Sequence, residues 1–401
     1  MNILYLCDEY PPGRHGGIGT AVQLLAREMV KQGHKVVVAG FAYWGYSGKD
    51  YFEDNGVVVY RFRRVLSSKI LQKQDKLFVR GIYHLFDSTG IFHQDIKSSL
   101  VKYKYFLEDI ISRYKIDLVE MPDYNDYMRF CKSYVPFPKL SVPVIVKLHG
   151  GMTYIARGNK NDVKPYIWQM EHDLLMQADA VCSVSQYNAD KTSEYLKFTG
   201  PVKVLYNGIN THDMPENEGK VINRVIYTGS LTENKGVYQL MKAWNLVNEQ
   251  MPSAELWLFG KGPVKKVAKL LTSDALKTVF FKGHVSRHQL FNELTRANVA
   301  IFPSFAESFA MAPMEAMACG TAVIYTRTTS GPEIIKDGKD GLLINPENEK
   351  EIADKILFLL NNKEVTNTFA ENGKNKVIEY FDISISAKKA ENYYYTVKNS
   401  F

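Results

Sequence analysis

Two glutamates with seven residues between them, Glu307 and Glu315, lie in the segment PSFAESFAMAPMEAMACG, which follows the apolar run VAIF. Pro313 suits the first turn of a helix, where its missing N–H costs no hydrogen bond, and Gly320 suits the helix end. We therefore expect Glu315 in the first turn of a short helix and Glu307 in the loop before it. Because helical side chains lean toward the N-terminus, Glu315 can approach the opening where Glu307 stands.

The start of this helix also offers backbone groups to a ligand. The N–H groups of Phe309, Ala310 and Met311 are expected to face the same opening as the two carboxylates. Amides at a helix start bind phosphate, and carboxylates accept hydrogen bonds from hydroxyl groups, so the combination fits a sugar nucleotide. The alternative is purely structural, because acidic side chains near a helix N-terminus are favourable without a ligand.

A glycine-rich loop lies near the N-terminus, in EYPPGRHGGIG, between an apolar run and a helical pattern. Gly16, Gly17 and Gly19 allow the backbone to approach a ligand closely. Their spacing differs from the GxGxxG pattern of dinucleotide-binding proteins, so we do not infer NAD binding. The alternative is a flexible turn before a helix.

A lysine and a histidine lie at comparable places in the chain. Lys235 precedes Gly236 and a helix start in TENKG, where a mobile ammonium group suits a diphosphate. His149 follows an apolar run in KLHGG and is expected at the carboxyl end of a strand. The alternatives are a solvated loop lysine and a structural histidine.

Two series of alternating strands and helices are predicted to position these residues. Helical patterns between the strands, such as residues 165–177, favour parallel strands. Residues 42–114 give no clear assignment. The predicted strands cover residues 2–7, 34–41, 116–124, 142–150, 180–185 and 202–209 in the first series, and 224–230, 254–260, 278–283, 299–304, 321–326 and 341–345 in the second.

This order predicts an α/β protein with two Rossmann-like, doubly wound domains that face a central cleft. The strand C-termini of each sheet are expected to line that cleft. The predicted domains are an N-terminal Rossmann-like domain of residues 1–206 and a C-terminal Rossmann-like domain of residues 207–380. Residues 381–401 are expected to form a helix that packs back on the first domain.

The glutamate segment resembles the E-x7-E signature of retaining glycosyltransferases of the GT-B fold, in the large family numbered four. Other segments resemble motifs of the same family in the same order, and the resemblance covers nearly the whole chain. As a set these motifs are specific. They are EYPPGRHGGIG, KLHG, VLYNGIN, YTGSLTENKG, FGKGP and SGPEII.

The resemblance implies an enzyme that moves a sugar from a nucleoside-diphosphate sugar to an acceptor hydroxyl with retention of configuration. The setting it implies is polysaccharide, lipopolysaccharide or glycolipid assembly. Glu315 would hold the ribose hydroxyls, and Glu307 the hydroxyls of the donor sugar. The implied catalytic residues are Glu307, His149 and Lys235. The implied donor-binding residues are Gly16, Gly17, Gly229, Ser230, Lys235, Lys261, Ser308, Phe309, Ala310, Met311 and Glu315.

The sequence departs from the family pattern at several positions. Ser230 stands where the family usually has an arginine, so one of two cations expected beside the diphosphate is replaced. Lys261, in FGKGP, is a candidate substitute. Ala310 and Ala322 stand where glycine and proline are more frequent. Glu333, in SGPEII, either lies near the nucleotide or caps a helix.

The resemblance implies that the C-terminal domain binds the nucleotide-sugar donor and that the N-terminal domain binds the acceptor. The acceptor is expected to be a saccharide or a lipid-linked saccharide. Tyr43, Trp44 and Tyr46 are candidates to stack on sugar rings, and Asn207 either lines the cleft or forms part of a turn. The basic stretch of residues 61–80 has two interpretations. It either contacts an anionic membrane as a peripheral site or forms a solvated charged face.

The bulk properties fit a globular protein, with 45% apolar and 23% charged residues. The net charge of +7 suits anionic partners without choosing among them, and we expect no nucleic-acid partner. The absence of an Asp-any-Asp pair predicts a metal-independent enzyme without a cofactor. With no leader and no apolar run of about 20 residues, we expect a cytoplasmic protein, or one at the inner face of the membrane.

The cysteines and the remaining functional alternatives complete the sequence-based expectations. The four cysteines form no CxxC pair, which predicts buried, reduced thiols: Cys7, Cys131, Cys182 and Cys319. A sugar-nucleotide epimerase or hydrolase of the GT-B fold would need no acceptor. A non-catalytic nucleotide-sugar sensor is the other alternative, because the departures from the family pattern leave room for it.

Overall fold

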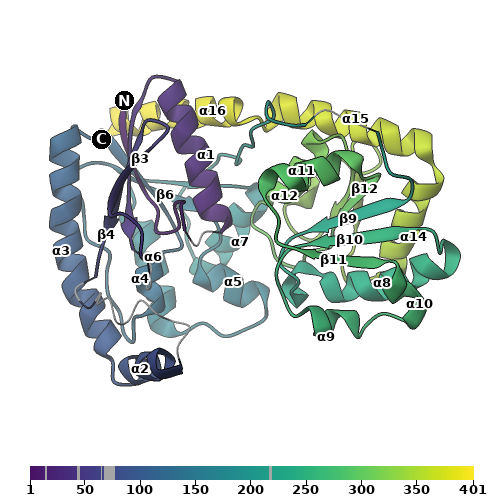
Figure 1. Ribbon diagram of the computed structural model, residues 1–401. Coiled ribbons are helices and arrows are strands. Elements are labelled where there is room, and N and C mark those ends of the chain that lie inside the picture. The colour runs from purple at the N-terminus through teal and green to yellow at the C-terminus, as the bar shows by residue number, and fades with distance from the viewer. Residues whose placement is uncertain (14–15, 43–45, 65, 67–76, 216–218) are drawn as a thin grey trace. The chain divides into compact units, whose positions relative to one another are not determined.

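The computed structural model covers residues 1–401 and describes residues 1–13, 16–42, 46–64, 66, 77–215 and 219–401. The chain divides into two compact units, Met1–Gly208 with Ser386–Phe401, and Ile209–Ile385. Each unit is built around one sheet of mainly parallel strands with helices against it (Figure 1). The predicted α/β class with two Rossmann-like, doubly wound units is therefore confirmed.

The sheet of the first unit has eight strands in the order β3-β4-β2-β1-β5-β6-β7-β8. Neighbours are parallel except β3 and β4, which form an antiparallel pair at one edge. The chain runs outward from β1 on one side and returns to β5 on the other. The loops after β1 and β5 therefore lie at the switch point of the sheet, where open α/β sheets bind ligands. The strands are β1 (Asn2–Leu6), β2 (Lys35–Phe41), β3 (Tyr51–Asp54), β4 (Val57–Phe62), β5 (Leu118–Pro122), β6 (Val144–Leu148), β7 (Ala180–Ser183) and β8 (Val202–Val204).

Helices complete the first unit. α3 and α6 share one hydrophobic core with the sheet, and much of the previously unassigned stretch 42–114 contains β3, β4, α2 and α3. The strand predicted at residues 202–209 is too long, because the chain leaves the sheet edge after Val204 and reaches the unit boundary at Gly208. The helices are α1 (Gly17–Lys31), α2 (Leu77–Ser88), α3 (Ile91–Tyr114), α4 (Asp126–Arg129), α5 (Met152–Gly158), α6 (Pro165–Gln177), α7 (Gln186–Leu196) and α16 (Ile383–Ser400), of which residues from Ser386 onward belong to this unit.

Buried polar contacts tie α16 to the sheet of the first unit. The hydroxyl of Tyr394 donates to Oε2 of Glu120 on β5 at 2.5 Å and lies 3.3 Å from the hydroxyl of Tyr5 on β1. Oε1 of Glu120 lies 3.7 Å from Nζ of Lys147. Glu120 is only 3% exposed, so its carboxylate depends on these partners.

Replacing Tyr394 by Phe should lower the free energy of unfolding by about 1.5–3 kcal/mol, because a buried carboxylate loses a donor. Urea unfolding measures this change. Tyr395, on the same helix, is 42% exposed, and Tyr395→Phe is the matched control. Equal stability of the two variants would contradict the importance of the Tyr394–Glu120 bond.

The sheet of the second unit has six parallel strands in the order β11-β10-β9-β12-β13-β14. The chain runs outward from β9 to β11, then returns to β12 beside β9. The loops after β9 and β12 therefore lie at the switch point of this sheet. The strands are β9 (Arg224–Thr228), β10 (Glu255–Phe259), β11 (Val279–Gly283), β12 (Val299–Phe302), β13 (Ala322–Thr326) and β14 (Leu342–Ile344).

The core of the second unit lies between the sheet and its helices. α8 and α14 belong to one hydrophobic cluster with the strands, in which Trp244 is fully buried. α11 and α12 lie together on another side of the unit (Figure 1). The helices are η1 (Glu233–Lys235), α8 (Val237–Gln250), α9 (Val264–Ala268), α10 (Ser273–Lys277), α11 (Arg287–Arg296), α12 (Met311–Ala318), α13 (Gly331–Ile334), α14 (Glu349–Asn361) and α15 (Lys363–Tyr380).

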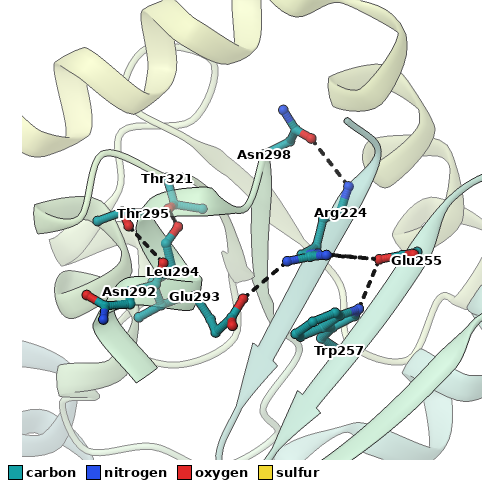
Figure 2. Close-up of polar contacts among 9 residues, drawn as sticks. All are labelled: Arg224, Glu255, Trp257, Asn292, Glu293, Leu294, Thr295, Asn298 and Thr321. Carbon is teal, nitrogen blue, oxygen red and sulfur yellow. Dashed lines mark hydrogen bonds and ion pairs between the residues drawn. The ribbon is translucent and has the colours of Figure 1, made fainter. Parts of the chain in front are cut away.

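A buried arginine at the start of β9 fixes α11 (Figure 2). Arg224 is 8% exposed and pairs with Glu255 on β10 at 3.3 Å and with Glu293 on α11 at 3.1 Å. Its guanidinium carbon lies 3.7 Å from the ring centre of Trp257. The backbone N–H of Arg224 donates to Oδ1 of Asn298 at 3.3 Å, which ties the end of α11 to the same strand. These contacts hold the helix whose first residue belongs to the candidate site.

Two sequence-based expectations concern the whole chain. The four cysteines are buried and form no disulfide. Within the described ranges, every helix is too short or too polar to cross a lipid bilayer.

Candidate active site

The loops that follow β9 and β12 touch each other at the switch point of the second unit. Gly236, directly after η1, has a φ of +69°, and a Cβ atom there would lie 1.8 Å from the carbonyl oxygen of Pro303. The N–H of Phe305 donates to the carbonyl oxygen of Asn234 at 2.9 Å. Only glycine permits this approach, so the order Lys235-Gly236 holds the lysine beside the loop after β12.

This loop contact brings together two residues that the sequence singled out separately. Nζ of Lys235 lies 2.5 Å from Oε1 of Glu307, and the hydroxyl of Ser304 donates to the same oxygen at 3.1 Å. The side chains of Lys235 and Glu307 are 32% and 16% exposed. Their partial shielding from water strengthens the attraction between the charges. One cation and one carboxylate thus stand side by side at the ligand edge of the sheet.

Glu315 lies one turn deeper in its helix than the sequence predicted. α12 begins at Met311, after the cap residue Ala310, and has no acidic residue in its first turn. The expectation was wrong because the helix starts before Pro313, which occupies its third position. Oε1 of Glu315 pairs with Nη2 of Arg287 at 2.9 Å. Burial raises the pKa of Glu315, and Arg287 opposes that shift.

Arg287 is a candidate functional residue that the sequence analysis missed. It is the first residue of α11, after a capping box formed by Ser286 and Gln289. The S-x-x-Q pattern directly after a strand marks a helix start at the ligand edge of the sheet, and this was the available signal. The Arg287 side chain is 42% exposed, so it can contact both Glu315 and a ligand.

A second pair of loops holds the proposed substitute for the family arginine. A Cβ atom at Gly260 would lie 1.8 Å from the carbonyl oxygen of Gly229, and the N–H of Leu231 donates to the carbonyl oxygen of Lys261 at 2.8 Å. The loops after β9 and β10 are therefore in direct contact. Ser230 and Lys261 are both exposed there, one on each loop.

The segment between Glu307 and α12 has mixed burial. Phe309 is buried, with its ring centre 5.9 Å from that of Phe381. Ser308, Ala310 and Met311 are half-buried. Ala310 is the cap of α12, so the first amides of that helix follow here. Contact of these amides with a ligand stays a prediction.

The glycine loop of the first unit leads into α1. Gly16 is the cap of this helix, and its N–H donates to Oε2 of Glu9 at 3.0 Å. Gly16 and Gly17 are both exposed, and a Cβ atom at Gly17 would meet no heavy atom within 4 Å. The backbone at Gly17 is therefore open to approach, although a bound diphosphate there stays a prediction.

His149 directly follows β6 and is held by Asp123, which directly follows β5. The N–H of His149 donates to Oδ1 of Asp123 at 2.8 Å, and the N–H of Gly150 to Oδ2 at 3.2 Å. Burial lowers the pKa of His149 to about 3, and nearby Lys147 adds to that effect. The imidazole is therefore neutral near pH 7, which suits hydrogen bonding to a sugar. The sequence analysis missed Asp123, whose position after a strand in VEMPDY was the signal.

The structure describes only some of the predicted acceptor residues, and those that it describes are buried. Tyr43 and Trp44 lie outside the described residues. Tyr46 is buried, and its hydroxyl donates to the carbonyl oxygen of Lys49 at 2.9 Å, so the stacking role proposed for it is wrong. Asn207 is also buried at the end of the first unit. Glu333 lies in the first turn of α13, as a capping role requires.

The basic stretch 61–80 does not present all of its charge to solvent. Arg61 and Arg64 are 5% and 4% exposed. Arg61 donates to the carbonyl oxygen of Cys7 at 3.1 Å, and the Arg64 guanidinium carbon lies 4.2 Å from the ring centre of Phe130. These two arginines support the fold, so neither interpretation of the stretch as an exposed basic face holds for them.

Comparison with known proteins identifies the family to which the chain belongs. A family profile described as Glycosyltransferase Family 4 matches residues 15–213, and one described as Glycosyl transferases group 1 matches residues 212–376. The chain is a family 4 glycosyltransferase. The family and the enzyme class inferred from the motifs are thereby confirmed.

Individual relatives agree with this membership. An uncharacterised glycosyltransferase of Methanocaldococcus jannaschii is 29% identical over 300 residues, which cover 74% of this glycosyltransferase and 79% of that protein. An MMP alpha-(1->4)-mannosyltransferase of Mycolicibacterium hassiacum is 24% identical, with 91% of each chain covered. The solved structure of a sucrose-phosphate synthase from Thermosynechococcus elongatus matches the fold over 100% of both chains, with a TM-score of 0.76 and 18% identity.

Replacing Gly236 by Ala should destabilise the second unit and separate Lys235 from Glu307, because the carbonyl of Pro303 must move. Gly338 has a similar φ of +70°, but a Cβ atom there would meet no heavy atom within 4 Å, so Gly338→Ala is the matched control. The control should lose about 1–2 kcal/mol from backbone strain. Gly236→Ala should lose about 1–3 kcal/mol more from overpacking. Equal losses in urea unfolding would contradict the close loop contact.

Proposed function

We propose that this glycosyltransferase moves a sugar from a nucleoside-diphosphate sugar to an acceptor hydroxyl and retains the anomeric configuration. The observation that carries the proposal is the pairing of Lys235 with Glu307 at the switch point of the second unit. A diphosphate needs a cation, and a sugar needs a hydrogen-bond acceptor for its hydroxyl groups. The pair offers both within one contact.

The neighbouring residues fit the remaining parts of such a donor. Glu315 is proposed to bind the ribose hydroxyls, since Arg287 engages only its Oε1 among the described residues. Lys261 is proposed to supply the second positive charge that the family obtains from arginine, because its loop contacts the loop of Ser230. The proposed donor site therefore uses lysine where a planar guanidinium is usual.

The proposed reaction needs no base from the protein. The bond between the anomeric carbon and the diphosphate oxygen breaks, and the acceptor oxygen forms a bond to the same face of that carbon. The leaving phosphate oxygen takes the acceptor proton, and Lys235 stabilises its developing negative charge. On the first unit, His149 is proposed to contact the transferred sugar as a neutral ring, and Gly17 to donate its N–H to the diphosphate.

The proposed setting is polysaccharide, lipopolysaccharide or glycolipid assembly, with a saccharide or lipid-linked saccharide as acceptor. The lysines and backbone amides are proposed to balance the diphosphate charge without a metal ion. A thermal-shift panel of UDP, GDP, ADP and NAD, each with magnesium and with a chelator, tests the donor site. A ligand at about 100 times its Kd should stabilise the fold by about 2.7 kcal/mol. A shift with one nucleoside diphosphate that chelator leaves unchanged supports the proposal, and no shift with any of them contradicts it.

Replacing Glu307 by Gln should abolish most turnover while leaving the affinity for the nucleoside diphosphate nearly unchanged. The carboxylate is proposed to bind sugar hydroxyls, which a free nucleoside diphosphate lacks. Transfer assays measure turnover, and calorimetric titration measures affinity. Glu349, which forms an exposed pair with Lys242 at 3.1 Å, gives the matched control Glu349→Gln. Normal turnover of Glu307→Gln would refute the proposed role.

A further inference from the structure

Two buried carboxylates hold the backbone beside His149. Asp123 accepts the N–H groups of His149 and Gly150 at 2.8 and 3.2 Å. Glu171, on α6, accepts the N–H of Met152 at 2.5 Å and that of Thr153 at 2.9 Å. Four amides within five consecutive residues are therefore bound by acidic side chains that come from elsewhere in the first unit.

Gly151 lies between the two sets of contacts. A Cβ atom at this position would lie 2.5 Å from Oε1 of Glu171 and 3.5 Å from Oδ2 of Asp123. The glycine therefore lets both carboxylates close on the same short segment. Glu171 is 2% exposed and Asp123 is 3% exposed, so water competes little for either group.

The neighbours of Glu171 in the sequence have other partners. Nδ1 of His172 lies 2.9 Å from the carbonyl oxygen of Leu196, and Asp173 accepts the hydroxyl of Tyr134 at 2.5 Å. The run Glu171-His172-Asp173 is thus not one cluster. Only Glu171 reaches the segment that carries His149.

We propose that Asp123 and Glu171 are positioning residues that fix the backbone of residues 149–153 and thereby set the direction of the His149 imidazole. The inference rests on the proposed contact of His149 with the transferred sugar. A displacement of about 1 Å at a reacting group can cost about 100-fold in rate. A carboxylate is the suitable clamp because each of its oxygens accepts from a separate N–H.

Ionising the buried carboxyl groups of Asp123 and Glu171 costs free energy of folding. Burial raises the pKa of Asp123 to about 6 and that of Glu171 to about 7, although the amides oppose both shifts. Because the folded-state pKa of each carboxyl group is raised, its protonated form contributes to the stability of the fold at low pH. This contribution is lost as the pH rises through about 6 to 7. The ionised forms, however, are the stronger acceptors for the amides. Stability and alignment of His149 should therefore change in opposite directions with pH.

Other ionisable groups lie near Asp123 and Glu171 on neighbouring elements. Burial keeps Cys182 protonated and His149 neutral in this pH range, since the pKa of Cys182 is raised and that of His149 is lowered to about 3. Tyr127 on α4 interacts with Glu171, Cys182 on β7 interacts with Asp123, and Glu120 on β5 and Lys147 on β6 interact in turn with Cys182.

The test compares the full-length variants Glu171→Gln and Asp123→Asn with the wild type, and uses Asp173→Asn on the same helix as the matched control. A glutamine has one acceptor oxygen, so its NH2 group must face one of the two N–H donors. Hydrogen exchange followed by mass spectrometry measures protection of residues 149–153. Transfer assays with the donor found in the nucleotide panel give kcat and KM from pH 5 to 8.

We expect Glu171→Gln to increase exchange in this segment and to lower kcat by about 100-fold with little change in the donor KM. Wild-type kcat should rise between about pH 6 and 7 while thermal stability falls, and Glu171→Gln should lose the upper part of that rise. Asp173→Asn should match the wild type in hydrogen exchange, in kcat and in thermal stability. If Glu171→Gln does not fold, Asp123→Asn gives the same test through the other carboxylate.

Unchanged exchange, or increased exchange with wild-type kcat, would overturn the inference. A merely structural role would make kcat follow thermal stability across the pH range, which also counts against it. If the wild type transfers sugar from no donor, the proposed function fails separately. The positioning role of Asp123 and Glu171 is then tested by hydrogen exchange of residues 149–153 and by the NMR chemical shifts of the His149 ring. Glu171→Gln must change both.

Discussion

The contact between Gly236 and the carbonyl of Pro303 is the constraint on which the candidate donor site depends. It allows the turn before α8 to reach the loop after β12, and it places Lys235 on Glu307. Without a ligand, each charge neutralises the other. A bound donor would offer phosphate oxygens to the lysine and hydroxyl groups to the carboxylate, so both groups are already in place before it arrives.

The two units use the same principle with different chemistry. In each, residues that directly follow strands of a parallel sheet are held by contacts from neighbouring segments. The second unit holds a lysine against a carboxylate, whereas the first uses Asp123 and Glu171 to hold amides beside a neutral histidine. Arg224 forms a comparable buried ion network at the amino end of β9, away from the carboxyl ends of the strands where the candidate site lies. It anchors α11 without belonging to that site.

The sequence predicted the helices and strands that have a strong hydrophobic periodicity or clear start and end signals. Helix α6 was placed at its observed bounds because Pro165 marks its start, and most predicted strands lie within a few residues of the observed ones. Strands β3 and β4 were not predicted, because they fall in the stretch 42–114 that the sequence left unassigned. Glu307 and Lys235 were recognised through their motifs, yet their mutual contact depends on two loops that are far apart in the chain. The partner of Glu315 could not be predicted for the same reason, since Arg287 is 28 residues away.

Burial explains why the expectations for the basic stretch and for Tyr46 failed. Arg61 and Arg64 are polar residues that a surface would normally expose, but inside the first unit Arg61 donates to the carbonyl oxygen of Cys7 and Arg64 lies over the ring of Phe130. Tyr46 is buried for a similar reason, beneath the guanidinium groups of Arg61 and Arg63. The two amide partners of Glu171 likewise depend on the packing of α6 against the segment after β6, which the sequence alone does not show.

The most direct test of the donor site is the binding of a nucleoside diphosphate and its monophosphate to the wild type and to Lys235→Met, measured by calorimetric titration. The nucleoside is the one that stabilises the fold in a nucleotide panel. If Lys235 faces the phosphate next to the sugar, the variant should lose at least about tenfold in affinity for the diphosphate, worth about 1.4 kcal/mol. Its affinity for the monophosphate should stay unchanged. Equal binding of the diphosphate by both proteins would contradict the account.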